Sequence, residues 1–575
     1  MLLDFRNVNT LWCSVLVETL VRLGLKEAII CPGSRSTPLT VAFVNHPQIK
    51  TIPILDERSA AFFALGKAKR TNVPVVLLCS SGTAGANFYP AVIEASESRI
   101  PLIVLTADRP PELRHCHAGQ TIDQIKLYGN YPNWYAELAL PEASVDMLAY
   151  LRQNIVQAWK KSLYPHRGIV HLNCPFREPL APIVRAEIET KKERLLEANF
   201  FAHLEPSHNI QNIEPHLKLP SIKLSPLGII VAGLTQTPYP EKYCREIALL
   251  SQKLQFPVLA EALSPLRNYA NLNPYLIATY DAILREPAKA AKLQPQAIVQ
   301  IGELPTSKQL RNWLARLSAP RYVVIQDWEN FDPLHGKTIH LKTSLRAFIQ
   351  RVSLKDGNQG TKYLQTWCTF ESEMRKKIAL KLEPLNNLYE GKVAWLISQH
   401  LPSQTPIFLA NSMSVRNAEF FWQPNDTRVI PYFNRGANGI DGTLSTALGI
   451  ADNGRPTVML TGDLALLHDT NGFLINQNFS GHLTIILINN NGGGIFEILP
   501  IAQFDPPFEK YFATPQNIDF ALLCQTYGVK YHLIENWQQL PPLLNPLPST
   551  GIRLLEIKTN RKQDADWLKN NLGQL

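Results

Sequence analysis

Short, continuous apolar runs alternate with amphipathic segments of helix length over most of the chain. Between residues 28 and 174 the apolar runs read "AIIC", "TIPIL", "PVVLLC", "PLIVLT" and "GIVHLN". The segments between them, such as "ERSAAFFALGKAKR", place apolar residues at helical spacing. Apolar strands that alternate with helices predict a parallel sheet covered on both faces. The first block is therefore predicted to be a doubly wound α/β domain.

The same alternation recurs twice, which predicts three α/β domains. The second block has "GIIVAGL", "PVLAEAL", "AIVQIGE" and "RYVVIQDW" as its strands, and the third has "PIFLANS", "RVIPYF", "PTVMLTGD", "LTIILINN" and "RLLEIKT". The length of 575 residues also exceeds what one core usually organises. The predicted domains are residues 1–182, 227–350 and 376–575, and the stretches 183–226 and 351–375 are predicted linkers.

Composition narrows the class of protein. The chain carries 57 Lys and Arg against 48 Asp and Glu, a net charge of +9, with no long basic block, so nucleic acid is not expected as a partner. Eight cysteines form no CxxC pair, and several lie inside apolar runs, which predicts free thiols in a reducing compartment. The N-terminal stretch has the pattern of an amphipathic helix rather than a signal peptide, and no run of about 18 apolar residues occurs. We expect a cytoplasmic enzyme without a membrane span.

Two oxygen-bearing side chains follow consecutive apolar runs of the third block. Asp463 follows "PTVMLTG" and Asn490 follows "LTIILIN". If these runs are parallel strands joined by a helix over residues 465–477, a right-handed crossover brings both side chains to one edge of the sheet. Carboxylate, amide and carbonyl oxygens suit magnesium, and Gly462 with the start of the helix offers N–H groups to an anion. The alternative is a helix cap at Asp463 and an asparagine turn, and this stretch alone favours neither interpretation.

The pair of motifs resembles the diphosphate-binding site of the thiamine-diphosphate (ThDP) enzymes, in which "GD" is followed at a distance by "NN". The three blocks resemble the pyrimidine-binding, central and diphosphate-binding domains of that superfamily. The common motif has glycine in its third place, where this chain has Leu464. The predicted fold class is therefore α/β, with three doubly wound parallel-sheet domains of the ThDP-enzyme type. The resemblance implies ThDP bound by Gly462, Asp463, Leu464 and Asn490, with Mg²⁺, or Mn²⁺ in its place, held by Asp463, Asn490 and the carbonyl of Gly492.

Glu57 is the residue that the resemblance places against the aminopyrimidine ring of the cofactor. In "IPILDERSAAFFALGKAKR" it follows an apolar run and opens an amphipathic segment. The resemblance implies that Glu57 favours the imino tautomer of the ring, which then removes the proton from the thiazolium carbon. A dry site supports such a shared proton because it disfavours the bare carboxylate. Without the second motif, an acidic first-turn residue favoured by the helix dipole would be the stronger interpretation.

Finer motifs point to one family within the superfamily. "CPGSRSTPL", "SSGTAGANFYPAVIEAS", "LTADRPPEL", "NRGANGIDGTLSTALGIA" and "NNNGGGIFEILP" resemble those of the 2-succinyl-5-enolpyruvyl-6-hydroxy-3-cyclohexene-1-carboxylate (SEPHCHC) synthases. That resemblance implies decarboxylation of 2-oxoglutarate and addition of the succinyl carbanion equivalent to isochorismate. The products would be SEPHCHC and CO₂, on the route to menaquinone or phylloquinone.

Both implied substrates carry two carboxylates, so arginines with bidentate geometry are expected. Matching the family motifs implies catalytic roles for Glu57, Arg35, Arg416 and Arg435. It implies substrate binding by Ser34, Arg35, Arg109, Gln120, Lys308, Ser412, Arg416, Arg435, Ile495, Phe496 and Leu499. Ile440 matches the apolar residue that supports the bent cofactor. The alternatives are solvated surface charges for the arginines and plain core packing for Ile495, Phe496 and Leu499.

One loop departs from the family pattern. Before Gln120 the family commonly reads Gly-Ala-Asn, whereas this chain has "HAG", and we hypothesise that His117 contacts a substrate carboxylate. The resemblance further implies a homodimer or homotetramer whose active site lies at a subunit interface. The alternatives are another ThDP-dependent 2-oxo-acid decarboxylase or carboligase, and a catalytically silent cofactor-binding scaffold. The central block has no GxGxxG after a strand, so no flavin or nicotinamide is expected.

Overall fold

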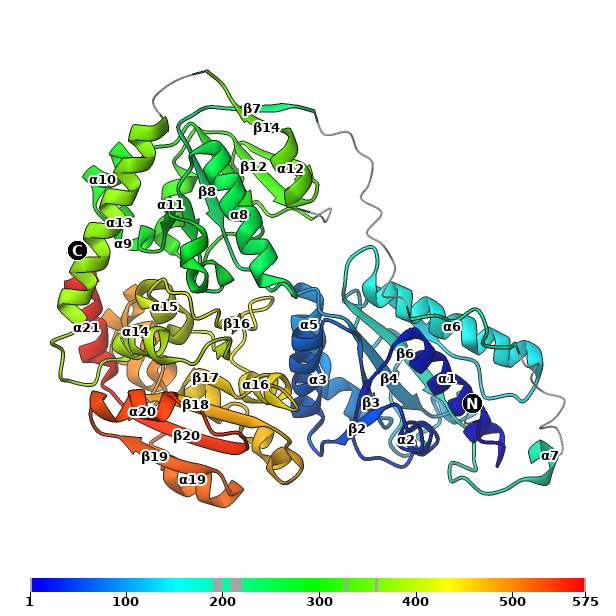
Figure 1. Ribbon diagram of the computed structural model, residues 1–575. Helices are drawn as coiled ribbons and strands as arrows, with labels where there is room; N and C mark the ends of the chain where they lie inside the picture. Colours follow the sequence, from blue (N-terminus) through cyan, green and yellow to red (C-terminus); the bar gives the residue numbers. More distant parts are fainter. Residues whose placement is uncertain (1–2, 190–198, 207–219, 326–328, 357–359, 573–575) are drawn as a thin grey trace. The chain divides into compact units, whose positions relative to one another are not determined.

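The computed structural model describes residues 3–189, 199–206, 220–325, 329–356 and 360–572 (Figure 1). The chain forms two compact units, each assembled from three separate segments. Unit 1 comprises Met1–Asn212, Asn434–Asp452 and His468–Phe479, and unit 2 comprises Ile213–Phe433, Asn453–Leu467 and Ser480–Leu575. Two short segments of the predicted third domain thus belong to unit 1. The domain boundaries drawn from the sequence stay predictions, and part of the stretch 183–226 lies outside the described residues.

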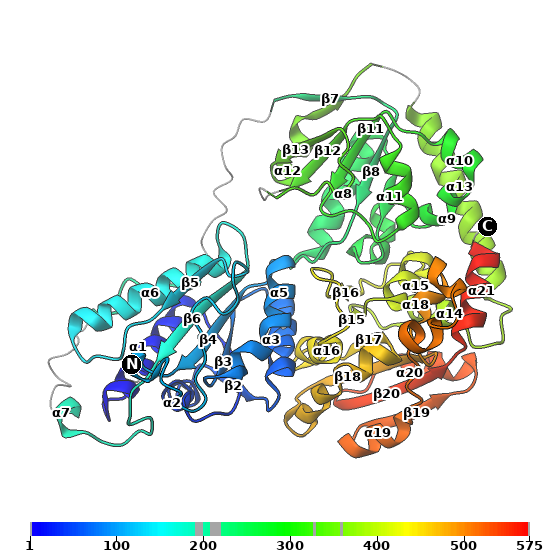
Figure 2. The ribbon, with the colours of Figure 1, turned by 180° about the vertical axis from the view of Figure 1, so that it is seen from behind.

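Unit 1 contains a six-stranded parallel sheet in the order β2-β1-β3-β4-β6-β5. Its strands are β1 Glu27–Ile30, β2 Lys50–Pro53, β3 Val75–Cys79, β4 Leu102–Asp108, β5 Trp134–Glu137 and β6 Ile169–Pro175. Its helices are α1 Val8–Leu23, α2 Thr37–Val44, α3 Glu57–Thr71, α4 Thr83–Asn87, α5 Tyr89–Glu97, α6 Val145–Leu163, α7 Ala186–Glu189 and α16 Thr443–Ala451, with 3₁₀ turns at Pro111–Leu113 and Thr470–Asn478. One core lies between the sheet and α1, α2 and α6, and α3 packs on the sheet from the other side, as seen from behind in Figure 2.

Unit 2 contains two six-stranded parallel sheets and a two-stranded one. The central sheet has the order β10-β9-β8-β11-β12-β13, and the C-terminal sheet has the order β16-β15-β17-β18-β20-β19. The strands are β7 Ile222–Leu224, β8 Gly228–Ala232, β9 Val258–Ala260, β10 Leu276–Ile277, β11 Ala297–Ile301, β12 Arg321–Ile325, β13 Thr338–Lys342, β14 Val352–Leu354, β15 Pro406–Leu409, β16 Ile430–Tyr432, β17 Thr457–Gly462, β18 His482–Asn489, β19 Lys530–Ile534 and β20 Gly551–Lys558. The α/β class and the three doubly wound sheets predicted from the sequence are confirmed.

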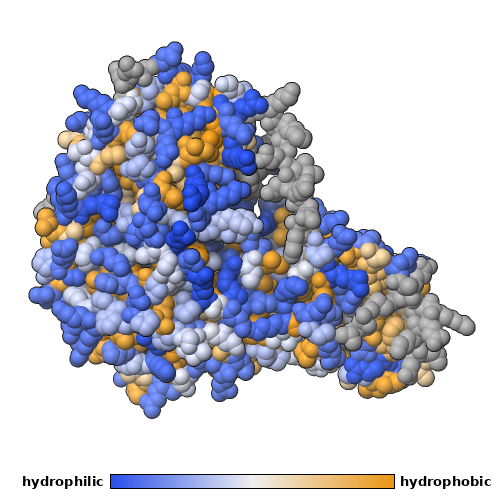
Figure 3. Space-filling view, viewed as in Figure 1, coloured by the Kyte–Doolittle hydropathy of each residue, from blue (hydrophilic) through white to orange (hydrophobic). Residues whose placement is uncertain are grey.

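Helices of varied length cover the sheets of unit 2. They are α8 Pro240–Leu254, α9 Tyr280–Arg285, α10 Pro287–Lys292, α11 Lys308–Ala315, α12 Leu345–Arg351, α13 Gly360–Leu382, α14 Glu390–His400, α15 Met413–Phe421, α17 Asp463–Leu467, α18 Gly494–Glu497, α19 Phe520–Tyr527, α20 Leu540–Leu544 and α21 Arg561–Leu572. The shorter turns are Pro265–Asn268, Ala270–Leu272, Pro500–Gln503, Glu509–Ala513 and Trp537–Gln539. None of the helices in the described part of the chain combines the length and the apolar character that a membrane span needs. Apolar and polar residues are interspersed on the face shown in Figure 3.

Two details differ from the sequence interpretation. The single helix expected over residues 465–477 is a short α-helix, α17, followed by the 3₁₀ helix Thr470–Asn478. Among the strands of the three six-stranded sheets, the apolar runs identified from the sequence did not include β5, β10, β13 and β19. All four are edge strands of their sheets; β5, β13 and β19 are only partly buried, whereas β10 is a buried strand of two residues. An edge strand needs no continuous apolar run, so the pattern of the sequence does not mark it.

Candidate active site

The carboxyl edge of the unit 1 sheet has a switch point between β1 and β3. These strands are neighbours, and β2 lies on the far side of β1, which is the arrangement that opens a ligand crevice in doubly wound sheets. The loops that follow β1 and β3 touch there. A Cβ atom on Gly33 would lie 2.2 Å from the Cβ atom of Ser80, so this approach requires glycine. Ser34 and Arg35 follow directly on the same loop.

Glu57 opens α3 at this edge. The preceding Asp56 caps the helix by accepting a hydrogen bond from the Ser59 backbone N–H at 2.9 Å, which leaves the Glu57 carboxylate without a capping role. Among the described residues that carboxylate, which is half-buried, has no hydrogen-bond partner. Burial raises the pKa of the Cys31 and Cys79 thiols, and the nearby charge of Glu57 raises both further. The carboxylate therefore lies over the ends of β1 and β3, available to a ligand.

Arg35 is buried, although it is an arginine in a loop. Its Nη1 donates to the Phe176 carbonyl at 3.0 Å, and its Nη2 lies 3.5 Å from the exposed carboxylate of Glu178. The Nε atom is buried with no hydrogen-bond partner in the described part of the chain. A buried guanidinium that keeps an unused donor is suited to binding an anion.

Arg109 and Gln120 are joined through one loop. Arg109 follows β4, and its Nη2 donates to the Gly119 carbonyl at 2.9 Å. Gln120 has a φ of 56° and exchanges two hydrogen bonds with Ser81, at 2.9 and 3.0 Å. His117 is exposed on the same loop, with a φ of 57°. The structure thus brings Arg109 and Gln120 together at the carboxyl edge of the sheet.

The segment Asn434–Asp452 adds Arg435 and Ile440 to unit 1. The Glu94 carboxylate of α5 accepts from the backbone N–H groups of Gly436 and Ala437, at 3.1 and 2.7 Å. These bonds hold the loop that joins Arg435 to Ile440. Gly442, just before α16, packs against the ring of Phe62 near the start of α3. Further along α3, Lys67 pairs with Asp452, which caps the C-terminal end of α16. The two helices therefore run in the same direction, with Glu57 and Ile440 at the same end of the pair.

The other predicted residues lie in unit 2, and three of them follow neighbouring strands of the C-terminal sheet. Ser412 follows β15, Asp463 follows β17 and Asn490 follows β18. The Asp463 carboxylate is buried and accepts from the backbone N–H of Gly492 at 2.8 Å. Burial raises the pKa of Asp463 to about 6, although the backbone N–H groups of Leu464 and Gly492 act in the opposite direction. A nearby cation would favour the carboxylate.

Asn490 presents an unused oxygen beside Asp463. Its Nδ2 donates to a Glu390 carboxylate oxygen at 3.4 Å, while its Oδ1 is buried without a partner among the described residues. A Cβ atom on Gly462 would meet nothing within 4 Å, so there is open space beside the strand end. No group of three or more His, Cys, Asp or Glu side chains in the described residues could hold a metal ion. One carboxylate, one amide oxygen and a backbone carbonyl nevertheless fit Mg²⁺, which keeps further ligands from water and phosphate.

Two charged residues that the sequence interpretation did not single out support this loop. Arg561, at the start of α21, donates to the Asn491 carbonyl and to Glu497, both at 2.9 Å, and also to Glu509. Burial, with the nearby Asp564 carboxylate, raises the pKa of Glu390 above its usual value. Neither residue lies in a recognisable motif, and both come from elements far along the chain from Asn490.

The remaining predicted residues are dispersed in unit 2. Ser412 has a φ of 68°, and its carbonyl accepts from Arg416 Nη1 at 2.7 Å. Lys308 is exposed at the start of α11 beside the central sheet. The three predicted apolar wall residues lie on α18 or just after it and are half-buried or exposed: Ile495, Phe496 and Leu499. The ring of Phe496 makes an edge contact with that of Phe512. Their incomplete burial leaves apolar surface near the Asn490 loop.

Comparisons with known proteins bear on both units. Three family models match in order: the thiamine pyrophosphate enzyme N-terminal TPP binding domain at residues 13–127, the middle domain at 205–409 and the C-terminal TPP binding domain at 412–556. SEPHCHC synthases of three organisms are similar along the full chain. The protein of Gloeothece citriformis is 63% identical, covering 100% of this chain and 99% of its own, and that of Rippkaea orientalis is 59% identical, covering 100% and 98%. The protein of Trichodesmium erythraeum is 59% identical, covering 100% and 99%. The chain belongs to the 2-succinyl-5-enolpyruvyl-6-hydroxy-3-cyclohexene-1-carboxylate synthase family of thiamine-diphosphate enzymes.

Proposed function

We propose that the protein decarboxylates 2-oxoglutarate and adds the resulting succinyl unit to isochorismate, giving SEPHCHC and CO₂ in menaquinone or phylloquinone biosynthesis. The observation that carries the proposal is full-length identity of 54–63% to eight proteins that bear the name of this synthase. Thiamine diphosphate, when bound, supplies the carbanion stabilisation that the decarboxylation needs. The protein's own residues then bind, orient and move protons.

Glu57 is the proposed acid that hydrogen-bonds the aminopyrimidine ring. The support is its carboxylate over the strand ends, which has no hydrogen-bond partner in the described part of the chain, in the same unit as Ile440, whose side chain is proposed to support the bent cofactor. Asp463, the Asn490 Oδ1 atom and the Gly492 carbonyl are the proposed ligands of Mg²⁺, or of Mn²⁺ in its place, and Gly462 and Leu464 are proposed to contact the diphosphate. The support is an amide oxygen that has no partner among the residues of known placement, next to a buried carboxylate.

Substrate carboxylates are the proposed partners of the basic and polar residues in both units. Arg35 and Arg109 each retain a buried Nε donor that no described residue uses, which supports anion binding. The other proposed substrate residues are Ser34, Gln120, Lys308, Ser412, Arg416, Arg435, Ile495, Phe496 and Leu499. Proposed catalytic roles fall to Glu57, Arg35, Arg416 and Arg435.

We also propose a homo-oligomer in the cytoplasm, with an active site completed at the subunit interface as the family resemblance implies. The eight cysteines are all free thiols, which suits a reducing compartment. Gel filtration that finds a fully active monomer would contradict the assembly.

The activity is tested by supplying isochorismate, 2-oxoglutarate, ThDP and Mg²⁺ and measuring the adduct and CO₂. Glu57→Gln should lower kcat at least about 100-fold, because proton transfer by a placed side chain contributes about 10²–10⁴. Release of CO₂ without the adduct would favour another ThDP carboligase. A Glu57→Gln variant as active as the parent would refute the proton role of this residue.

A further inference from the structure

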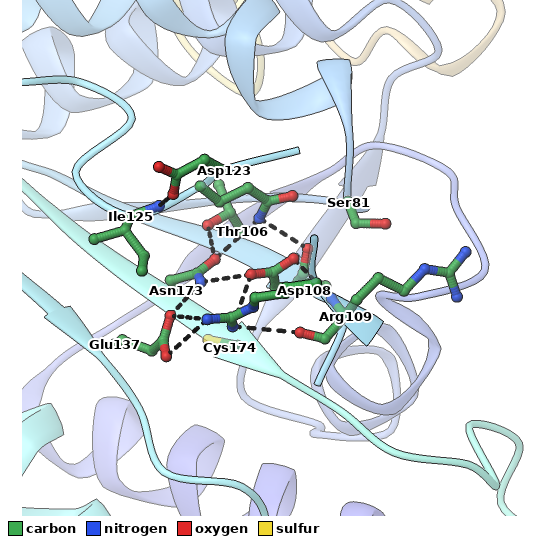
Figure 4. A network of polar contacts seen from close by, with 12 residues as sticks. Ser81, Thr106, Asp108, Arg109, Asp123, Ile125, Glu137, Asn173 and Cys174 are labelled. Carbon is green, nitrogen blue, oxygen red and sulfur yellow. Dashed lines mark hydrogen bonds and ion pairs between the residues drawn. The ribbon is translucent and has the colours of Figure 1, made fainter. Parts of the chain in front are cut away.

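Asn173 lies at the centre of a buried polar network near the carboxyl end of the unit 1 sheet (Figure 4). It stands on β6, in register with Thr106 on β4 and with Glu137 on β5. In-register residues of neighbouring parallel strands point to the same face, so these three polar side chains meet. The side chains of Thr106 and Asn173 are fully buried. A buried polar cluster of this kind is stable only when its members satisfy one another.

The Asn173 amide uses its full hydrogen-bonding capacity. Its Oδ1 accepts from Thr106 Oγ1 and from Gln124 Nε2, both at 2.9 Å. Its Nδ2 donates to Asp108 at 2.8 Å and to Glu137 at 3.0 Å. Two carboxylates on one side and two donors on the other determine which way the amide points. No other residue type of the same shape provides two donors and two acceptors in these directions.

One arm of the network runs from Asn173 to Gln120. Gln124 is buried, and its Oε1 accepts from the Gly82 backbone N–H at 3.0 Å. Gly82 has a φ of 81°, and a Cβ atom there would lie 2.8 Å from Gln120 Cγ. The neighbouring Ser81 exchanges two hydrogen bonds with Gln120. A shift of Gln124 therefore moves the strand-end loop against which Gln120 is packed.

The second arm runs from Asn173 to Arg109 and meets the first. The Asp108 carboxylate accepts from the Arg109 backbone N–H at 2.7 Å. Arg114 pairs with Asp108 at 3.0 Å, and its Nη2 also donates to the Arg109 carbonyl at 3.3 Å. Both backbone groups of Arg109 are thus held, and its guanidinium extends to the Gly119 carbonyl, next to Gln120. In Figure 4 the Arg109 side chain points away from the polar cluster.

We propose that Asn173 is a positioning residue for substrate binding, because it sets the places of Gln120 and Arg109 through these two arms. The inference rests on the proposed function, in which Gln120 and Arg109 meet substrate carboxylates. Asn173 itself is fully buried beneath the loop, so it acts through Gln120 and Arg109. Its contribution is a fixed geometry for two residues that lie on loops.

Asn173→Asp tests the proposal with almost no change of shape. The new oxygen would face Asp108 and Glu137 with lone pairs, so a donor becomes an acceptor among carboxylates, and the network must rearrange. Asn133→Asp is the matched control. Asn133 Nδ2 also donates two hydrogen bonds, to the carbonyls of Lys161 and His166 at 3.1 and 3.0 Å. Asn133 directly precedes β5, so it lies at the amino ends of the strands of the same sheet.

Hydrogen exchange and kinetics are measured on the full-length holoenzyme. Asn173→Asp should speed exchange in peptides that cover residues 80–82 and 117–124, and lower kcat/KM at least about tenfold, the factor that corresponds to 1.4 kcal/mol. Asn133→Asp should leave both within about twofold. In a Gln120→Ala background the effect of Asn173→Asp should shrink, because residues that act through one another are not additive. If Asn173→Asp does not fold, Gln124→Leu, which cuts only the first arm, should give the same exchange pattern at residues 80–82.

Unchanged exchange at residues 117–124 would overturn the proposal, as would an equal loss of kcat/KM in the parent and Gln120→Ala backgrounds. A parent enzyme that forms no adduct, with the exchange pattern as expected, would overturn the proposed reaction and leave the positioning of the loop supported.

Discussion

Replacing Lys67 with methionine should destabilise unit 1 by an amount that the structure allows us to work out. Lys67 is fully buried on α3, and its ammonium group lies 2.7 Å from the Glu27 carboxylate and 2.9 Å from that of Asp452. Removing one partner of a buried ion pair costs about 3–5 kcal/mol. Asp452 retains Lys50 at 3.1 Å, and the Glu27 side chain is 15% exposed, so we expect the lower end, about 3 kcal/mol. At about 2–4 °C per kcal/mol for a unit of this size, the melting temperature should fall by about 6–12 °C.

The effect should depend on pH in a defined direction. Burial alone would raise the pKa of Asp452, but Lys67 and Lys50 hold it below its usual value. A carboxyl group with a lowered pKa in the folded state stabilises the protein above its unfolded pKa, and this contribution is lost as the pH falls through the folded value. Without Lys67, burial should raise the pKa of Asp452, so the variant takes up a proton at higher pH than the parent does. The difference in melting temperature should therefore be greatest near neutral pH and narrow toward about pH 4.

Thermal unfolding followed by circular dichroism at about pH 7.5 and about pH 5 measures both effects. Arg177→Met is the control, because it breaks an ion pair with Glu112 whose side chains are 61% and 48% exposed. Surface pairs contribute little, so the control should shift the melting temperature by less than about 2 °C. A shift this small for Lys67→Met, or a difference that does not narrow at the lower pH, would refute the reasoning.

Three further predictions concern single positions. In Gly449→Ala the new Cβ would lie 2.1 Å from a backbone oxygen of α3, so the melting temperature should fall at least about 4 °C, whereas Gly119→Ala, with nothing within 4 Å, should not change it. Arg561→Leu leaves the Asn491 carbonyl without this donor, so the Mg²⁺ concentration needed for half-maximal ThDP binding should rise about tenfold. A fluorescence titration measures this concentration, and an unchanged value would contradict the prediction. His117→Gly, at an exposed position with positive φ, should raise the KM of one substrate several-fold without lowering the melting temperature. If the KM values of both substrates are the same in the variant as in the parent, the hypothesis is wrong.

The central strands and the fold class could be predicted from the sequence alone. Strands such as β3 and β18 are buried on both faces, so their apolar runs are continuous and visible. The partly exposed edge strands β5, β13 and β19 carry no such run and were missed. Glu57, Asp463 and Asn490 were predicted because motifs of the family mark them, and their roles stay predictions.

Tertiary structure alone decided which distant residues support these positions. Register between β4, β6 and β5 brings Thr106, Asn173 and Glu137 together, and no local pattern indicates that meeting. Packing of α16 on α3 pairs Lys67 with Asp452, which lies in another predicted domain. Local periodicity reports the burial of a residue within its own element. Contacts between elements depend on strand order and helix packing, so the sequence determined the sheets and the candidate site, while the folded chain determined what holds that site in place.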